Sequence, residues 1–259
     1  MQSASTVQFP GVINMRTIKH LKTKKGRTET GLFIIEGEKF VQEIPRAWQV
    51  QQYVIAERYA KTRDITQLES RAQCTIVRDS IFDSLADTVS PQGILAVCVQ
   101  KKFHLHDIGM SFILLGENLN DPGNIGALIR TAAAAGASGV ILTAGSGDIF
   151  NPKVLRAAAG AVLRLPIVTD AQLEDTIAWL NEKSVPVYAA APRGSVLPYE
   201  LDMRGSFCLL VGNESHGITE TAAQMADVLV RLPMVNSMES LNASVAGSIL
   251  MYEAVRQRN

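Results

Sequence analysis

The sequence has 259 residues, of which 47% are hydrophobic and 19% charged, and its 25 basic and 25 acidic side chains give no net charge. This composition argues against disorder and provides the apolar content for one large or two modest packed domains. No apolar run approaches the ~20 residues needed to cross a bilayer, and residues 1–15 lack the features of a secretory signal, so we expect a cytoplasmic protein without a membrane segment.

Residues 1–30 are polar and basic, and we predict an arm with one short helix. A run without any acidic residue lies within it, formed by Arg16, Lys19, Lys22, Lys24, Lys25 and Arg27. Such a run is either a solvated face or a contact for nucleic acid, and the charge alone leaves both open. Residues 1–106 carry 15 basic and 10 acidic side chains, and residues 107–259 carry the reverse, so basic charge is concentrated in the first half.

A small α/β unit follows this arm. Strands are predicted at residues 32–35, 48–55, 74–77 and 93–99, with a helix at 38–44 that ends at Pro45 and a helical turn after Asp79 or Ser80. Residues 100–109 mix charge, histidine and glycine between two apolar strands. We therefore place a domain boundary there and divide the chain into residues 1–105 and 106–259.

The second domain repeats strand and helix. Strands are predicted at residues 112–115, 139–142, near 167, 185–189, 207–211 and 228–232, and helices at 124–135, from Asn151-Pro152 onward, 171–180 and 241–256. Continuous apolar strands separated by helices indicate a buried, mostly parallel sheet. Ligands of such α/β folds bind beyond the carboxyl ends of the strands.

Several common site motifs are absent from the sequence. The glycine-rich nucleotide loops fail, because Phe150 stands where a third glycine should follow Gly145 and Gly147. The four histidines do not cluster at metal-ligand spacing, so we expect no metal. Cys74, Cys98 and Cys208 lie far apart, and we interpret them as buried thiols rather than a disulfide framework.

The loop and helix at residues 118–131 follow the first strand of the second domain. Asp121-Pro122-Gly123 forms a turn, and Asn124 can cap a helix whose apolar positions pack inward. Arg130 then lies on a different face of a helix otherwise built from apolar and small residues. A surface charge and a functional arginine both remain possible from this loop alone.

Two further loops combine strand ends with glycine and polar side chains. Residues 209–218 break a buried-type strand into Gly212-Asn213-Glu214 and then Gly217, where glycine allows the backbone to approach a ligand closely. Residues 230–248 lead into a helix for which Ser240 is a plausible N-cap, and a helix N-terminus favours anionic groups. An ordinary strand-to-helix loop and a capped packing helix are the alternatives.

Together these loops resemble the three signature motifs of the SpoU (TrmH) family of RNA ribose 2′-O-methyltransferases, within the SPOUT class. The matching positions are Asn118, Asp121, Pro122, Asn124, Gly126 and Arg130, then Gly212, Asn213, Glu214 and Gly217, then Pro233, Met234, Ser240, Leu241 and Asn242. Residues 33–37 and Gln92-Gly93 resemble the substrate-binding domain often fused to this family. Asn236 stands where relatives usually have glycine, but asparagine tolerates a left-handed backbone, so we expect the loop shape to be retained.

The resemblance implies a function and an architecture. It implies S-adenosylmethionine as methyl donor, RNA as substrate with ribosomal RNA favoured, a catalytic SPOUT-type domain at 106–259 with a trefoil knot, and a homodimer through that domain. The smaller α/β domain at 1–105 would bind RNA through its basic arm. By the same resemblance, Val211, Gly212, Leu232 and Leu241 would hold the cofactor, and Arg130, Asn124, Glu214, Ser240 and Asn242 would form the catalytic site.

Within this resemblance, side-chain chemistry suggests the role of Arg130, and the motifs imply the roles of the other site residues. Arginine is a poor proton acceptor, so we expect Arg130 to bind the target phosphate or stabilise negative charge on the 2′-oxygen, with the proton passing to phosphate or water. Asn124, Ser240 and Asn242 would orient the nucleotide, and Glu214 would order these groups.

Three alternatives stay open at this point. The substrate could be transfer RNA, the protein could be a non-catalytic RNA-binding member of the same fold, or it could be a nicotinamide-dependent oxidoreductase. The failed glycine fingerprint argues against the last of these.

Overall fold

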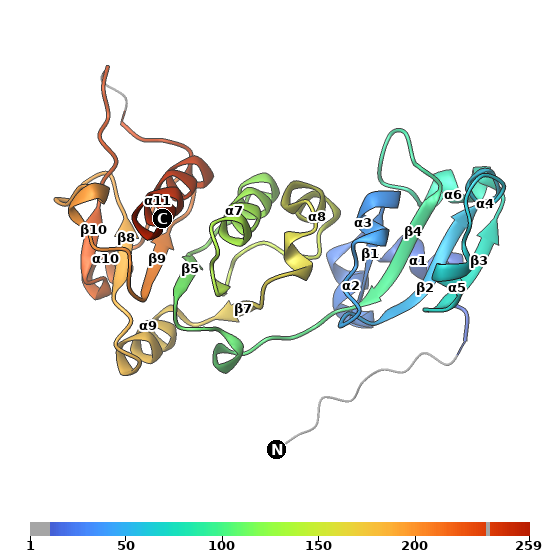
Figure 1. Cartoon of the computed structure of the whole chain (residues 1–259), viewed down its shortest axis with the longest axis horizontal. Coiled ribbons are helices and arrows are strands. Elements are labelled where there is room, and N and C mark those ends of the chain that lie inside the picture. The colour runs from blue at the N-terminus through green and yellow to red at the C-terminus, as the bar shows by residue number, and fades with distance from the viewer. Residues whose placement is uncertain (1–10, 237–238) are drawn as a thin grey trace. The chain divides into compact units, whose positions relative to one another are not determined.

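The computed structural model describes residues 11–236 and 239–259 (Figure 1). The chain forms two compact units, one containing residues up to Lys101 together with Phe150–Leu155, and the other containing Lys102–Ile149 and Arg156–Asn259. The short segment at 150–155 is not anticipated by a single boundary at residue 105.

The first unit is built on a four-stranded sheet with the order β1-β4-β2-β3. β1 and β2 are antiparallel to β4, whereas β2 and β3 are parallel. Its elements in chain order are α1 (Met15–His20), α2 (Lys24–Thr30), β1 (Leu32–Glu36), α3 (Glu38–Gln42), β2 (Val50–Ala56), α4 (Glu57–Ala60), α5 (Thr66–Glu69), β3 (Gln73–Val77), α6 (Asp79–Leu85) and β4 (Ile94–Val99). The four strands, the helix before Pro45 and the helical segment after residue 79 all form where the sequence predicted them.

The predicted basic arm is wrong for residues 15–30, which form two helices rather than one. Ile18 and Leu21 are buried in the same apolar cluster as Val54, Phe82 and Leu95, so α1 is part of the core of this unit. Residues 1–10 of the predicted arm lie outside the described residues.

The second unit contains a six-stranded sheet with the order β10-β8-β9-β5-β6-β7, in which every pair of neighbouring strands is parallel. The elements from residue 102 onward are η1 (Leu105–Asp107), β5 (Phe112–Gly116), α7 (Pro122–Ala134), β6 (Gly139–Thr143), α8 (Pro152–Ala158), η2 (Ala161–Leu163), β7 (Ile167–Ala171), α9 (Leu173–Glu182), β8 (Val187–Ala190), η3 (Pro198–Glu200), β9 (Phe207–Val211), α10 (Glu220–Met225), β10 (Val228–Val230) and α11 (Ala243–Arg258). All belong to the second unit except the first part of α8, which falls in the segment 150–155. The prediction of a buried parallel sheet is confirmed, because β5, β6 and β9 are buried along their whole length. The trefoil knot stays a prediction.

This topology sets the position of the site. Since β10, β8, β9 and β5 are adjacent and parallel, their carboxyl ends lie along the same edge of the sheet. The three loops with motif residues follow β5, β9 and β10, so the strand order brings together segments more than a hundred residues apart in sequence.

Candidate active site

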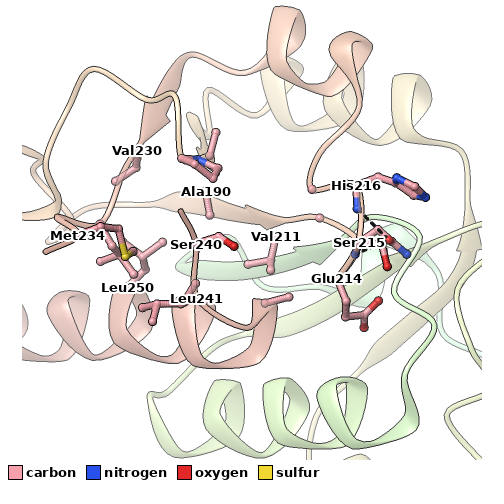
Figure 2. Close-up of a pocket in the computed structure, with 18 residues that line it drawn as sticks. Ala190, Val211, Glu214, Ser215, His216, Val230, Met234, Ser240, Leu241 and Leu250 are labelled. Carbon is pink, nitrogen blue, oxygen red and sulfur yellow. Dashed lines mark hydrogen bonds between the residues drawn. The ribbon is translucent and has the colours of Figure 1, made fainter. Parts of the chain in front are cut away.

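A cavity of about 270 Å³ lies at the carboxyl ends of β8, β9 and β10 (Figure 2). Apolar side chains line one part of it, among them Val211, Leu241 and Leu250, and the loop carrying Glu214 lines another. Its volume lies near the lower end of the roughly 300–1,000 Å³ range of ligand sites. An apolar wall with a polar rim suits a ligand that has both an aromatic and a charged part.

The loop after β9 folds back on itself beside this cavity. The backbone N–H of Asn213 donates to the carbonyl oxygen of Gly217 at 2.9 Å, and the N–H of Gly217 donates to the carbonyl of Asn213 at 2.9 Å. A Cβ atom on Gly212 would stand 2.3 Å from backbone atoms of Gly217 and Ile218, so only glycine fits there. The loop is thus a close-fitting backbone cradle that fits the adenosyl cofactor implied by the motifs.

A chain of side-chain hydrogen bonds joins the three motif loops. The Asn124 amide nitrogen Nδ2 donates to Glu214 Oε1 at 3.1 Å, and Asn242 Nδ2 donates to Asn124 Oδ1 at 3.0 Å. The backbone N–H of Asp121 also donates to Glu214 Oε1, at 3.3 Å. Three of the five predicted catalytic residues therefore contact one another directly, and Asn124 is buried between the other two.

The caps of the two helices at this site differ from the sequence predictions. Asp121, not Asn124, caps α7, since its Oδ1 accepts from the N–H of Asn124 at 2.9 Å. Asn242, not Ser240, caps α11, where its Oδ1 accepts from the N–H groups of Ser244 and Val245. Both predictions were wrong because several adjacent polar residues can each act as a cap. The choice among them depends on contacts with other elements, here those that Asn124 makes with Glu214 and with Asn242.

Arg130 and Ser240 stand apart from this hydrogen-bonded chain. Arg130 is exposed on α7, about 240° around the helix from Asn124, and no hydrogen bond or ion pair joins its side chain to another described residue. It is also not among the residues that line the cavity. Ser240 lines the cavity, and its hydroxyl has no hydrogen bond to the part of the chain that the structure describes.

The four predicted cofactor-binding residues, Val211, Gly212, Leu232 and Leu241, all line the cavity. The sequence analysis did not identify a further wall of the cavity, formed by residues 190–192 at the carboxyl end of β8 and by Leu250 of α11. No motif marks these positions. Knowledge of the strand order would have identified them, because they lie at the carboxyl end of the strand beside β9, where ligands of such sheets bind.

Asn236 adopts the left-handed backbone expected for a replacement of glycine, with φ of 57°. Residues 237–238, which follow it in the same loop, lie outside the described residues.

The six basic residues predicted to contact RNA lie in α1, α2 and the turn between them, and they differ in exposure. Arg16, Lys19, Lys24 and Lys25 are exposed. Arg27 is only 3% exposed, and its guanidinium donates to the carbonyl oxygens of Leu21 and Lys22, so its assignment as an RNA contact is contradicted by its burial.

The remaining cation of this run, Lys22, is half-buried. Its Nζ donates to the carbonyl oxygen of Ala86 at 2.6 Å, which engages the ammonium group within the unit.

Within residues 11–236 and 239–259, no three His, Cys, Asp or Glu side chains are grouped so as to hold a metal ion. No helix in these ranges has the length and apolar character needed to cross a membrane.

The cysteines largely match their interpretation as buried thiols. Burial raises the pKa of Cys98 to about 12 and raises that of Cys208 as well, whereas Cys74 is only partly buried.

The fold and the site define a methyltransferase of the SPOUT class. The SpoU methyltransferase AviRb from Streptomyces viridochromogenes, solved with AdoMet, superimposes with a TM-score of 0.87 at 25% identity over 96% of this chain and 98% of that one. An AdoMet-bound rRNA methyltransferase from Sinorhizobium meliloti matches with a TM-score of 0.85 at 31% identity, covering 93% and 94% of the two chains.

The chain belongs to the SpoU rRNA Methylase family, whose model matches residues 111–252, and an MRM3-like substrate binding domain matches residues 14–96. A relative from Bacillus subtilis, the 23S rRNA (guanosine(2553)-2′-O)-methyltransferase RlmP, is 36% identical over 90% of this chain and 92% of its own length. RlmB from Xylella fastidiosa, a 23S rRNA (guanosine-2′-O-)-methyltransferase, is 32% identical over 79% of this chain and 88% of its own. These findings confirm the family, the rRNA 2′-O-methyltransferase activity and the S-adenosylmethionine cofactor predicted from the sequence.

Proposed function

We propose that the chain methylates the ribose 2′-hydroxyl of a guanosine in large-subunit ribosomal RNA. The observation that carries the proposal is the hydrogen-bonded chain of Glu214, Asn124 and Asn242 at the edge of a cavity with a glycine cradle. The choice of nucleotide rests on the names of the Bacillus and Xylella relatives, which both act on guanosine of 23S rRNA. A cytoplasmic location stays a prediction that fits this substrate.

The proposal is tested by mapping 2′-O-methyl groups in RNA from cells with and without the gene, and by supplying the purified protein with labelled S-adenosylmethionine and separate 23S rRNA, 16S rRNA and tRNA. We expect one guanosine of 23S rRNA to lose its methyl group in the deletion strain and to gain label in vitro. Label in tRNA alone would favour the alternative substrate, and cofactor binding without label in any RNA would favour a non-catalytic RNA-binding protein.

The site residues divide into a cofactor group and a substrate group in this proposal. Val211, Gly212, Leu232 and Leu241 would hold S-adenosylmethionine, which supplies an electrophilic methyl group on its sulfonium when bound. Asn124 and Asn242 have their amides fixed by each other and by Glu214, so they offer a preorganised polar surface to the nucleotide. The unengaged hydroxyl of Ser240 is available to a ligand in the cavity.

We also propose that the chain forms a homodimer through the second unit. An exposed apolar stripe is formed by Leu241, just before α11, and by Val245, Ile249 and Tyr252 of α11, which are 38%, 46%, 45% and 53% exposed. A second copy packed on this stripe would remove it from water. Thr131, next to Arg130 in α7, shares a hydrogen bond of 3.0 Å with Ser248 of α11, so Arg130 lies close to this proposed interface.

The substitution Ile249→Asp is expected to convert the dimer into a monomer, because a carboxylate in the centre of an apolar interface would lose its hydration. Light scattering during gel filtration measures the mass. The control Ile76→Asp changes an isoleucine of the first unit with 51% exposure and is expected to leave the dimer intact. An unchanged mass for Ile249→Asp would rule out α11 as the dimer face.

The first unit, within the predicted RNA-binding domain of residues 1–105, would contribute RNA affinity through Arg16, Lys19, Lys24 and Lys25. These side chains lie on two consecutive helices and are exposed, and the Nζ of Lys25 lies 3.8 Å from a carboxylate oxygen of Glu29. The catalytic domain of residues 106–259 lacks an excess of basic residues, so affinity for phosphates is expected to depend on the first unit.

Replacing these four cations together with glutamine is expected to weaken RNA binding at least about tenfold and to reduce the slope of log affinity against log salt by about 3, since each phosphate contact on single strands contributes about 0.7. Filter binding at several salt concentrations measures both. Affinity for S-adenosylmethionine should stay constant. The pair Lys183→Gln and Arg204→Gln, exposed in the second unit, serves as a control that should leave the slope unchanged.

A further inference from the structure

The amide of Asn213 uses both its acceptor and its donor to hold the loop that carries Glu214. Its Oδ1 accepts from the backbone N–H groups of Ser215 and His216, at 2.9 and 3.2 Å. Its Nδ2 donates to the carbonyl oxygen of Asn118 at 2.8 Å. The first set of bonds shapes the loop itself, whereas the second ties it to the segment that follows β5.

The carbonyl of Asn118 is itself held in a fixed orientation. Asn118 has a left-handed backbone with φ of 50°, and its N–H donates to Thr143 Oγ1 at 3.0 Å. The side chain of Thr143 belongs to β6 and is buried. The partner of Asn213 is therefore a backbone group anchored on the sheet, so the bond fixes the loop relative to the fold.

The hydrogen bond from Asn213 to the Asn118 carbonyl bears on the position of the next residue, Glu214. Glu214 Oε1 accepts from Asn124 Nδ2 and from the N–H of Asp121, both contributed by the segment after β5. The Glu214 side chain has several rotatable bonds, so its contacts depend on where its backbone is held. The Asn213 amide sets that position by joining the same two segments one residue earlier.

We propose that Asn213 is a positioning residue for methyl transfer, which acts by placing the Glu214 carboxylate against Asn124. This inference rests on the proposed function of the site. The backbone bridge between Asn213 and Gly217 does not require the side chain, so the cofactor cradle should persist without the amide. Loss of the tie should therefore affect kcat more than cofactor binding, since displacement of a site by about 1 Å can lower the rate by about 10².

The test uses Asn213→Asp and Asn213→Ser in the full-length protein. Both keep an oxygen that can accept from the loop N–H groups. Aspartate has no donor for the Asn118 carbonyl, and serine has one hydroxyl on a shorter side chain in place of the separate Nδ2 that donates to Asn118. We expect each to lower kcat by roughly 10- to 100-fold, with the dissociation constant for S-adenosylmethionine, measured by calorimetry, within about threefold of the wild type. Two variants of different charge exclude an effect of the added carboxylate alone.

Asn120→Asp is the matched control. Asn120 Nδ2 donates to the same Asn118 carbonyl at 3.0 Å, but its side chain is not part of the Glu214 loop. This variant loses the same kind of donor to the same acceptor and should keep kcat within about twofold of the wild type. An equal loss of kcat in Asn120→Asp would show that the carbonyl environment, not the tie to Glu214, is responsible.

A double-mutant cycle with Glu214→Ala distinguishes positioning from general damage. If Asn213 acts through Glu214, adding Asn213→Ser to Glu214→Ala should change kcat less than about twofold. Additive losses in the cycle, single variants with wild-type kcat, or equal losses of kcat and cofactor affinity would each overturn the inference. Failure of the proposed function is a separate result, since the wild-type protein would then label no RNA.

Discussion

Arg130→Ala is expected to lower kcat by about 10²–10³-fold while the dissociation constant for S-adenosylmethionine changes less than about threefold. Removal of one group that stabilises developing charge has an effect of this size. The side chain of Arg130 does not line the cavity, so its loss should not disturb the cofactor. Single-turnover methylation and calorimetry measure the two quantities.

The charge and shape of the guanidinium should both matter. Arg130→Lys keeps the positive charge but cannot form a bidentate contact with phosphate, so we expect it to recover only part of the activity. Arg204→Ala is the control, because Arg204 is also an exposed arginine of the second unit and its ion pair is with nearby Asp202. Equal loss of cofactor affinity and kcat in Arg130→Ala would contradict this division of labour.

The position of Arg130 has a consequence for the substrate-binding arrangement. Within one chain, Asn124 points toward Glu214 and Asn242, whereas Arg130 is directed away from them along α7. If Arg130 acts on the same nucleotide as Asn124, there are two possible arrangements. Either the bound RNA extends to Arg130 of the same chain, or Arg130 is supplied by the second copy in the proposed dimer. Ile249→Asp should therefore reduce methylation as well as change the mass.

Much of the site could be predicted from the sequence because the motif residues are short-range patterns. Gly212 and Gly217 mark a tight backbone, and Glu214 follows a buried strand, so their place at a strand end was foreseeable. Wrong predictions concern choices among similar residues. Ser240 and Asn242 are both good caps, and only the contact of Asn242 with Asn124 on another helix shows which one the fold uses.

Other features depended on partners that a sequence does not display. Arg27 belongs to a run of cations, yet its partners are backbone carbonyls of the turn before α2, and carbonyl positions cannot be inferred from residue types. The apolar pair of Ile18 and Leu21 is too short to stand out as a helical pattern among basic residues. The core position of α1 therefore became evident only from its contacts with α6 and the sheet.

Gly212→Ala is expected to weaken S-adenosylmethionine binding by about 100-fold or more. An added Cβ would stand 2.3 Å from the backbone of Gly217 and Ile218, and a backbone cannot move aside as the end of a side chain can. The loop would have to open, which breaks the paired hydrogen bonds between Asn213 and Gly217 and deforms the wall of the cavity. Calorimetry with S-adenosylmethionine measures the loss.

A second glycine substitution separates this local effect from a general loss of stability. Gly205→Ala adds the same methyl group in the same unit at a position where the new Cβ would have no atom within 4 Å apart from its chain neighbours. Its cofactor affinity and melting temperature should therefore match the wild type.

The two site variants should also differ in their response to cofactor concentration. Because cofactor binding precedes methyl transfer, Gly212→Ala should lose activity through weaker cofactor binding, and part of that activity should return at high S-adenosylmethionine concentration. Arg130→Ala should show no such recovery, since its defect lies in the step after binding. A Gly212→Ala protein that binds the cofactor normally would show that the cavity beside β9 is not the cofactor site.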